Sequence, residues 1–508
     1  MERILTVMEF VVDEVLTVPA YLVGLITAVG LIALRRPLSQ IVGGGVKAAL
    51  GFLLIEVGAM LVTMSLKPLG TMIRSVTGAH GVIPNNEAIV ALVQAELGPR
   101  VPWVMFGGFV LSLLLARFTP LRYVFLTGHH ILWMSTLVTL VLAAARLPPV
   151  VTVLLGAVLL AVMFVSMPAL AQPWTRRVGG DGKIAIGHFG SLGYITAGLV
   201  GQLVGRRGRG TEDVQVPEGL RFLRDPMVST GLSMGLIYPL VAVAYLWKEG
   251  SATARRMFPP LHGAEPTVGH YFMQSVMQGL LFGVSVAVIL YGVRTILGEL
   301  IPAFQGIANR IVPGAVPALD APIVFPFGQN AVLVGFLASM TGALVSLAVV
   351  VAVLDPAAGI AVVLPGLLPQ FFTGGAAGVY GNATGGRRGA VCGGFVNGVL
   401  ITFLPAVLLG VLGRYGTANT TFGDTDFGWY GILIGYAARP GGVLGAVLAL
   451  LAGALVFTLA VIVQKRLVET GWDPGARRDA ELARLEAEHT RRTGRPETGE
   501  GGSDRTSS

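Results

Sequence analysis

The chain has 508 residues, of which 53% are hydrophobic and only 13% are charged. An ordinary globular chain has roughly 25% charged residues, so this composition excludes a soluble protein and indicates an integral membrane protein. The net charge of +8 comes from basic loops beside apolar segments, a pattern typical of membrane topology and not of nucleic-acid binding.

Apolar segments long enough to cross a bilayer recur along the chain, since a spanning helix needs about 20 apolar residues. The uninterrupted segments are 15–34, 45–66, 101–116, 123–145, 148–170, 227–247, 269–293, 331–354, 389–413 and 430–463. Three further segments, 184–204, 313–330 and 358–384, are interrupted by Gly, Pro or polar residues. We therefore expect an all-α fold with about eleven transmembrane helices plus re-entrant hairpins.

Basic residues beside these segments predict the topology. The pairs Arg35-Arg36 and Lys465-Arg466 favour a cytoplasmic position for both, which leaves the N-terminus outside and the C-terminus inside. Both flanks of 184–204 are basic, which favours a hairpin that enters and leaves from the cytoplasm. One basic cluster, at 248–256, falls on the outer side in this count and breaks the rule.

The composition changes near residue 466. Residues 473–508 carry seven Arg and eight acidic residues, with almost no apolar residue after Leu485. We expect residues 1–466 to form the transmembrane domain and residues 467–508 to form a cytoplasmic polar tail, largely disordered. A helix is predicted around Arg477–Arg491, where Glu and Arg interleave.

Histidines follow glycines in two of the apolar segments, as Gly128-His129-His130 and as Gly187-His188. An ionisable side chain within a membrane is costly, so it is by default a functional-site hypothesis. The alternative is a structural histidine bonded to a nearby carbonyl. Adjacent residues on a helix point about 100° apart, so we expect one of His129 and His130 to be functional and the other structural.

An isolated carboxylate, Asp320, lies in a stretch with three prolines between residues 313 and 322, which cannot form a regular helix. Irregular backbone at membrane depth is tolerated where it is buried in protein or lines a cavity. We expect this stretch to pack against 184–204 with Asp320 facing a ligand. The alternative is an ion pair with Arg310.

No pattern in the sequence indicates catalytic, metal or cofactor chemistry. Cys392 is the only cysteine, and no ligand cluster surrounds it. The Gly-rich stretch 374–386 follows no predicted strand and lacks the spacing of a P-loop. We therefore expect no catalytic residues, no metal and no cofactor.

Four stretches resemble the ascorbate-specific enzyme IIC family, the permease of the bacterial phosphoenolpyruvate-dependent phosphotransferase system. They are LTGHH (126–130), IAIGH (184–188), AFQGIANRIVPGAVPALDAPIVFPFGQNAVLVGF (303–336) and LPGLLPQFFTGGAAGVYGN (364–382). The resemblance extends from the first apolar segment to about residue 465. It implies a homodimer in the bacterial inner membrane, with a scaffold part that dimerises and a core part that carries the substrate like an elevator.

The resemblance also implies a function and partners. Members of the family import ascorbate, and a separate enzyme IIB, supplied with phosphate through enzyme IIA, phosphorylates it. The phosphoryl-transfer residues would then lie on the partner subunits, so whether this chain itself is an enzyme stays open. Alternatives are an ion-coupled secondary transporter of the same fold, a permease for a neutral sugar or polyol, and a non-transporting membrane scaffold or sensor.

Substrate contacts of the family, carried over by position, are expected at Asn86, Glu87, His129, His130, Ile131, Leu132, Trp133, His188, Phe189 and Asp320. Three positions depart from the family pattern, since Glu87 replaces a tyrosine, and Trp133 and Phe189 replace glutamines. An added carboxylate disfavours an anion such as ascorbate, while aromatic rings suit stacking on a sugar ring. We therefore expect weaker ascorbate recognition than in members that keep the tyrosine and glutamines.

Overall fold

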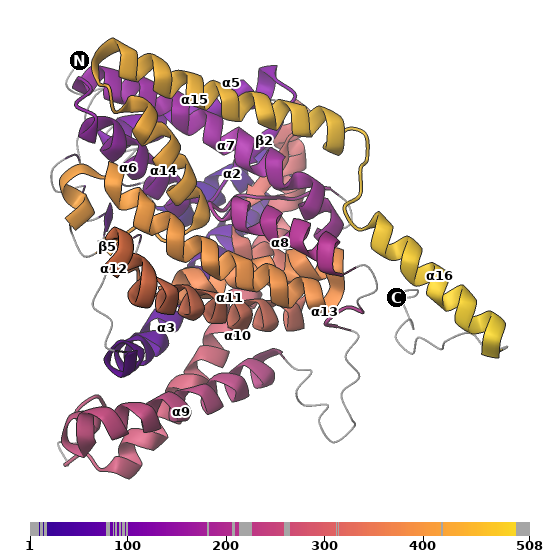
Figure 1. The fold of residues 1–508 in the computed structure, drawn as a ribbon. Coiled ribbons are helices and arrows are strands. Elements are labelled where there is room, and N and C mark those ends of the chain that lie inside the picture. Colours follow the sequence, from indigo (N-terminus) through magenta and orange to yellow (C-terminus); the bar gives the residue numbers. More distant parts are fainter. Residues whose placement is uncertain are drawn as a thin grey trace.

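The fold is described from a computed structural model. It describes residues 10, 14, 18–77, 82–84, 86, 89–90, 93, 97, 100–179, 182–205, 209–212, 226–258, 265–310, 312, 314–417 and 420–493. For some residues within the helices, Arg310 among them, only the backbone is described. Helices make up most of the described chain, and α16 extends away from the helical body (Figure 1).

One group of long helices consists of α2 (Pro19–Ala33), α3 (Leu38–Thr77), α9 (Pro226–Arg255) and α10 (Val268–Arg310), which pack against one another. Lys47 of α3 forms an ion pair with Glu299 of α10, with 2.9 Å between Nζ and Oε1. The Tyr271 hydroxyl donates a hydrogen bond of 3.1 Å to the Ala242 carbonyl and so joins α10 to α9. In Figure 1, α9 and the adjoining part of α10 form a lobe at the lower edge.

The remaining helices form a larger packed body. Its members are α5 (Val101–Phe118), α6 (Gly128–Ala144), α7 (Pro149–Gly179), α8 (Ser191–Val204), α11 (Gln329–Val349), α13 (Leu367–Leu408), α14 (Thr425–Ala438) and α15 (Gly442–Val463). Short helical segments join them: η3 (Ala321–Phe327), η4 (Val350–Leu354), α12 (Asp355–Ala358), η5 (Leu409–Val411), η6 (Gly413–Thr417) and η7 (Gln464–Val468). The hydrophobic core lies between these helices, and α7 is largely buried within it.

A small parallel sheet lies inside this body. Its strands β2 (Tyr123–Phe125), β3 (Ala185–Ile186) and β4 (Val316–Leu319) pair in the order β2-β4-β3. Phe125 pairs with Ala318, which also pairs with Ala185. The sheet gives backbone partners to segments that are not helical, as the membrane interior requires. A second parallel pair joins β1 (Ile83–Pro84) to β5 (Thr420–Thr421).

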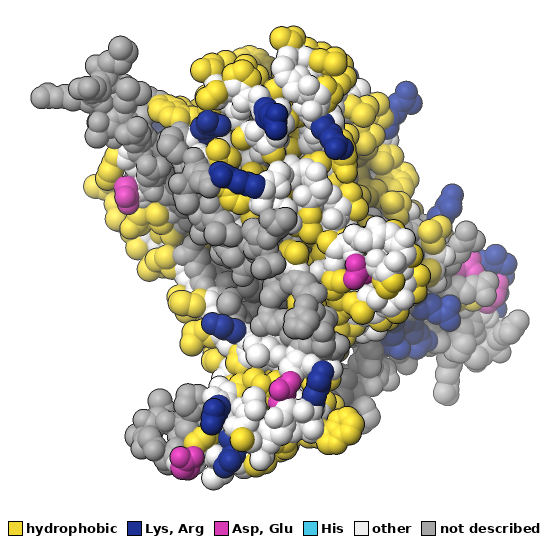
Figure 2. Space-filling view, turned by 60° about the vertical axis from the view of Figure 1, so that its left-hand side comes forward, with side chains coloured by type: hydrophobic (Ala, Val, Ile, Leu, Met, Phe, Trp, Pro, Cys, Tyr) yellow, Lys and Arg dark blue, Asp and Glu magenta, His cyan; other side chains and the backbone are white. Residues whose placement is uncertain are grey.

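Several described helices are long and apolar enough to cross a bilayer. They are Pro149–Gly179, Gln329–Ala358, Pro369–Val411 and Gly442–Val468, and shorter apolar helices accompany them. Hydrophobic side chains cover much of the described surface in Figure 2, while Lys and Arg lie in the upper part, along the right-hand side and in the lower lobe. The chain is thus a mostly helical, multi-pass membrane protein. The predicted total of about eleven spans and the orientation of the termini stay predictions.

Two predicted spans were wrong in detail. Residues 430–463 do not form one helix, because α14 ends at Ala438 and α15 begins at Gly442. Gly441 and Gly442 between them adopt φ values of 70° and 53°, the left-handed region that interrupts a helix. Residues 123–145 contain β2 before α6 begins. The all-α prediction also missed the short strands, because two to four residues are too few to show the alternation of apolar and polar side chains that marks a strand.

The division of the apolar sequence between 384 and 389 is confirmed. Gly386 adopts φ 60° within α13 and turns it into a hairpin of two helical arms. The arms touch at backbone level, since a Cβ on Gly381 would overlap the carbonyl oxygen of Gly389. Small residues allow such close approach of membrane helices. The tip also contacts α8, where a Cβ on Gly201 would overlap the Thr384 hydroxyl.

The predicted helix in the tail is confirmed as α16 (Ala476–Thr493). Arg177 of α7 holds its start through ion pairs with Asp473 at 3.2 Å and Asp479 at 2.7 Å. The tail 467–508 was predicted to be largely disordered; residues 467–493 are described and residues 494–508 lie outside the described chain. The domain boundary at residue 466 stays a prediction.

The contact between the arms of α13 predicts a stability effect. Gly381→Ala and Gly389→Ala should each destabilise the protein by about 1–3 kcal/mol, because the added methyl group overlaps backbone and forces the arms apart. Thermal unfolding in detergent measures the change. Gly43→Ala on α3 is the matched control, since its Cβ would meet nothing within 4 Å. Equal melting temperatures for all three variants would contradict this account of the hairpin.

Candidate functional site

The polar residues of the candidate site follow directly after the three buried strands. His129 and His130 come after β2, His188 comes after β3, and Asp320 comes after β4. Because parallel strands end at the same edge of a sheet, these side chains are brought together there, the usual position of ligand sites on parallel sheets. Residues far apart in sequence therefore form one cluster.

Asp320 lies between two histidines. The distance from His129 Nε2 to Asp320 Oδ2 is 3.5 Å, and that from His188 Nε2 to Asp320 Oδ1 is 3.9 Å. Both separations exceed the usual hydrogen-bond length of 2.7–3.2 Å. Asp320 Oδ1 accepts a bond of 2.7 Å from the N–H of Ala321, which fixes the carboxylate at the start of η3. The predicted packing of 313–322 against 184–204 is confirmed by the pairing of β4 with β3.

The two buried histidines contact each other. The rings of His130 and His188 have centroids 4.1 Å apart. The Tyr194 hydroxyl lies 2.8 Å from His188 Nδ1, and the N–H of Phe189 donates weakly to His130 Nδ1 at 3.4 Å. These contacts hold both rings in place, and they leave His188 Nε2 directed at Asp320. His129 is the more accessible histidine, with 27% of its side chain exposed.

Close contact with the backbone of β4 explains why a glycine, Gly187, precedes His188. The N–H of Gly187 donates a bond of 2.5 Å to the Leu319 carbonyl. A Cβ on Gly187 would overlap the carbonyl oxygen of Ala318. A larger residue would therefore push β3 away from β4 and separate His188 from Asp320.

Two carboxylates of the cluster, Asp424 and Asp426, were not predicted. Asp426 accepts hydrogen bonds from the N–H groups of Ser191 at 2.8 Å and Leu192 at 2.9 Å, and so caps the start of α8. Asp424 accepts a bond of 3.1 Å from the Asn86 amide. Both lie in a polar stretch between the predicted spans 389–413 and 430–463, so the argument from buried charge that singled out Asp320 did not apply to them.

The other predicted contacts are placed as follows. Trp133 is partly buried, and its ring centroid lies 4.8 Å from that of His129. Phe189 is fully buried, and its ring stacks on that of Phe125 with centroids 4.9 Å apart.

The remaining predicted contacts lie farther along α6 or before α5. Ile131 is buried and Leu132 is partly buried, both in the core around α6. Asn86 is buried beside Asp424, whereas Glu87 lies outside the described residues. Substrate binding by all of these residues stays a prediction.

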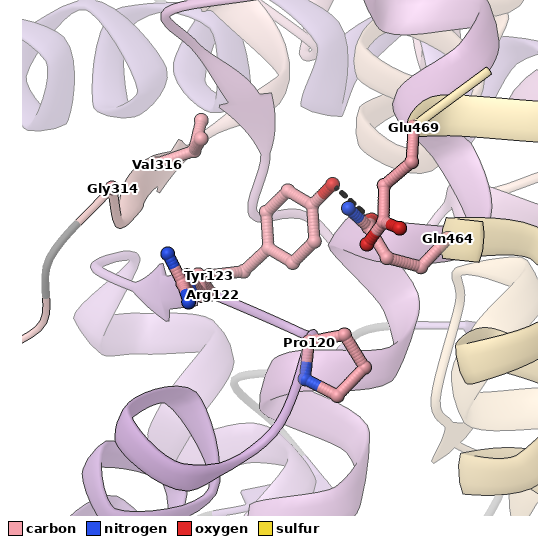
Figure 3. A pocket seen from close by; sticks show the side chains of 7 residues that line it. All are labelled: Pro120, Arg122, Tyr123, Gly314, Val316, Gln464 and Glu469. Carbon is pink, nitrogen blue, oxygen red and sulfur yellow. Dashed lines mark hydrogen bonds between the residues drawn. The ribbon is translucent and has the colours of Figure 1, made fainter.

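A pocket of about 370 Å³ lies at the opposite edge of the sheet (Figure 3). Tyr123 at the start of β2 points into it and donates a hydrogen bond of 2.7 Å to Gln464 of η7. The rest of its lining consists of Pro120, Arg122, Gly314, Val316 and Glu469. The strands therefore separate this pocket from the His–Asp cluster.

The sequence matches the EIIC-GAT family, described as the sugar-specific permease component of phosphotransferase systems, over residues 14–426. The chain belongs to this family. It is also 27% identical, over 422 aligned positions, to a protein of Mycoplasma pneumoniae (strain ATCC 29342 / M129 / Subtype 1) named "Ascorbate-specific PTS system EIIC component". That match covers 75% of this chain and 63% of the relative, so the chain spans less than two thirds of the relative's length. The resemblance noted in the sequence thus holds at the level of the family.

The Asp426 cap predicts a positioning effect. Asp426→Ala should lower stability by about 1–3 kcal/mol, because it leaves the N–H groups of Ser191 and Leu192 and the indole N–H of Trp429 without this acceptor. It should also weaken binding at the cluster, since α8 begins directly after His188. Unfolding and ligand-binding titrations measure the two effects. Asp479→Ala in the exposed tail is the control. The prediction would be contradicted if Asp426→Ala showed the same stability and the same binding affinity as this control.

Proposed function

We propose that this chain is the membrane permease subunit of a phosphotransferase system, and that His129, His188 and Asp320 bind a hydroxyl-rich carbohydrate. The observation that supports this most directly is the convergence of both Nε2 atoms on one carboxylate at gaps of 3.5 and 3.9 Å. These gaps suit bridging by ligand hydroxyl groups, which both donate and accept hydrogen bonds. A neutral imidazole offers one donor and one acceptor, and a carboxylate offers several acceptor positions.

Ascorbate is the first candidate substrate because the relative from Mycoplasma pneumoniae is named for it. A neutral sugar or polyol is the second, and the charges around the cluster favour it. Among the described residues, the ion-pair partners within 4.0 Å of Asp320 are His129 and His188, and neither is a permanent cation. Asp424 and Asp426 add two further buried carboxylates, which disfavour an anion.

Transport would use movement of the two helix groups. Phe52 of α3 lies against His129, with ring centroids 6.2 Å apart, so the group of long helices covers one side of the cluster. We propose that the body carrying the cluster moves against that group as an elevator, within a homodimer of about eleven spans per protomer. Enzyme IIB, supplied by enzyme IIA, would phosphorylate the sugar at the cytoplasmic face of the bacterial inner membrane.

The function is tested by uptake into vesicles with a panel of labelled sugars that includes ascorbate. Each sugar is offered with and without phosphoenolpyruvate and the soluble phosphotransferase proteins. We expect accumulation of a phosphorylated sugar only in the complete system. Accumulation driven by a proton gradient without phosphoenolpyruvate would instead support an ion-coupled transporter. Binding without any uptake would support a scaffold or sensor.

The cluster predicts which residues uptake requires. His129→Ala and Asp320→Asn should each reduce sugar binding and uptake at least about tenfold, because each removes a hydrogen bond to the sugar in a largely buried site and leaves its partner unsatisfied. His270→Ala on α10 is the matched control. Uptake by both cluster variants at the level of this control would show that the sugar binds elsewhere.

The side chain at position 133 is expected to influence whether the site prefers ascorbate or a neutral sugar. Trp133→Gln places a neutral amide, which both donates and accepts hydrogen bonds, beside His129, so it should raise the ratio of ascorbate binding to neutral-sugar binding several-fold. Phe189→Gln gives a contrasting result, because it places an amide within the stack on Phe125 and should mainly lower stability. Titrations with both ligands and thermal unfolding separate these effects. Tight, selective ascorbate binding by the unmodified protein would contradict the predicted preference.

A further inference from the structure

The pocket at the other edge of the sheet lies where a membrane span ends (Figure 3). Two of its lining residues, Gln464 and Glu469, come from the end of the apolar span Gly442–Val468, and Glu469 is the first residue after that span. Pro120 lies just beyond α5, which ends at Phe118. Basic residues also begin here on both segments, as they do where the hydrocarbon of a bilayer gives way to its headgroups. The pocket therefore lies at headgroup depth.

Opposite charges line two sides of this pocket. Figure 3 shows the guanidinium group of Arg122 on one side of the Tyr123 ring and the carboxylate of Glu469 on the other. Arg122 packs closely against the backbone before β4, since a Cβ on Gly314 would meet its Nη1 atom at 3.3 Å. The pocket thus offers a cation and an anion at separate points.

Hydrogen bonds fix the wall between the two charges. The Tyr123 hydroxyl donates a bond of 2.7 Å to Oε1 of Gln464 and so ties η7 to the start of β2. Arg176 of α7 donates a bond of 2.8 Å from Nη1 to the carbonyl of Val468, the residue before Glu469. These bonds hold the side of the pocket that carries Glu469 against the sheet.

A row of exposed apolar side chains leads along α15 to the pocket. Its members recur at intervals of three or four residues and therefore share one face of the helix: Leu451, Leu455, Leu459 and Ile462. Glu469 follows Ile462 by seven residues, about two helical turns. Apolar side chains exposed on a membrane span face the acyl chains of lipids. A lipid whose chains lie along this row would have its headgroup beside the pocket.

The size of the pocket suits a headgroup and not a whole lipid. Its volume of about 370 Å³ is near the lower limit of ligand pockets, which measure roughly 300–1,000 Å³. We propose that it binds the headgroup of phosphatidylethanolamine, with the phosphate on Arg122 and the ammonium group on Glu469. The planar fork of arginine matches phosphate oxygens, and an ammonium group donates charge-assisted hydrogen bonds to a carboxylate.

The same two residues predict selectivity among headgroups. Phosphatidylglycerol carries the phosphate without an ammonium group, so Glu469 would repel it as a like charge. Phosphatidylcholine carries a quaternary ammonium group, which has no N–H to donate to the carboxylate or to Gln464. Free phosphoethanolamine has the right charges but lacks the chains that lie along α15. This lipid site does not depend on the proposed carbohydrate permease function.

The test is lipid binding to the purified, delipidated full chain in detergent, measured by native mass spectrometry. We expect phosphatidylethanolamine to bind about tenfold more tightly than phosphatidylcholine or phosphatidylglycerol, the worth of one charge-assisted hydrogen bond. Arg122→Gln should weaken binding of all three lipids. Glu469→Gln should weaken phosphatidylethanolamine alone and so reduce the preference over phosphatidylglycerol. Arg466→Gln is the matched control, because it removes an exposed charge of η7 outside the pocket lining.

Each outcome decides the proposal. Glu469→Gln should unfold at the same temperature as Arg466→Gln in lipid-free detergent, so a loss of lipid preference without a loss of stability supports the site. Equal phosphatidylethanolamine affinity in all three variants would overturn it, as would equal binding of the three lipids by the unmodified chain. Soluble phosphoethanolamine that binds as tightly as the lipid would overturn the lipid as the ligand. None of these results alters the permease assignment, which the uptake panel tests.

Discussion

Backbone hydrogen bonding inside the membrane is the constraint on which the candidate site depends. Irregular segments at that depth must find partners for their N–H and C=O groups within the protein. Three such segments do so by pairing as β2, β4 and β3. Because these strands are parallel, the pairing that satisfies the backbone also brings His129, His188 and Asp320 to one edge. The proposed binding of a carbohydrate depends on the side chains that meet at that edge of the sheet.

Close packing makes the edge rigid. The arms of α13 approach each other at Gly381 and Gly389, and the tip of this hairpin packs on α8 at Gly201. Asp426, which belongs to α14, accepts hydrogen bonds from the first N–H groups of α8 and so fixes the start of that helix. His188 therefore lies between a sheet and a capped, tightly packed helix. A binding site needs such support, because its side chains must keep their positions when the ligand leaves.

Sequence patterns predicted much of this arrangement, and the failures have physical reasons. Hydropathy indicated a helical membrane protein, and the cost of burying ionisable groups singled out His129, His188 and Asp320. The strands were missed because pairing between short segments, such as Ala185 with Ala318, leaves no periodic signal. Asp426 was missed because it lies in a polar stretch between two predicted spans, and its bonds to the N–H groups of α8 leave no signal in the sequence. The packing of 313–322 against 184–204 was predicted, but the distances between the histidines and Asp320 come from tertiary structure, which spacing along the chain does not encode.

The central claim is that His188 and Asp320 act together on one ligand, and a double-mutant cycle on sugar binding tests it most directly. Dissociation constants are measured for the unmodified protein, His188→Ala, Asp320→Asn and the double variant, with ascorbate or the sugar that the uptake panel identifies. Residues that share a ligand should show a coupling energy of at least about 0.5 kcal/mol. Strictly additive losses would mean that the two side chains act independently, and would contradict the account.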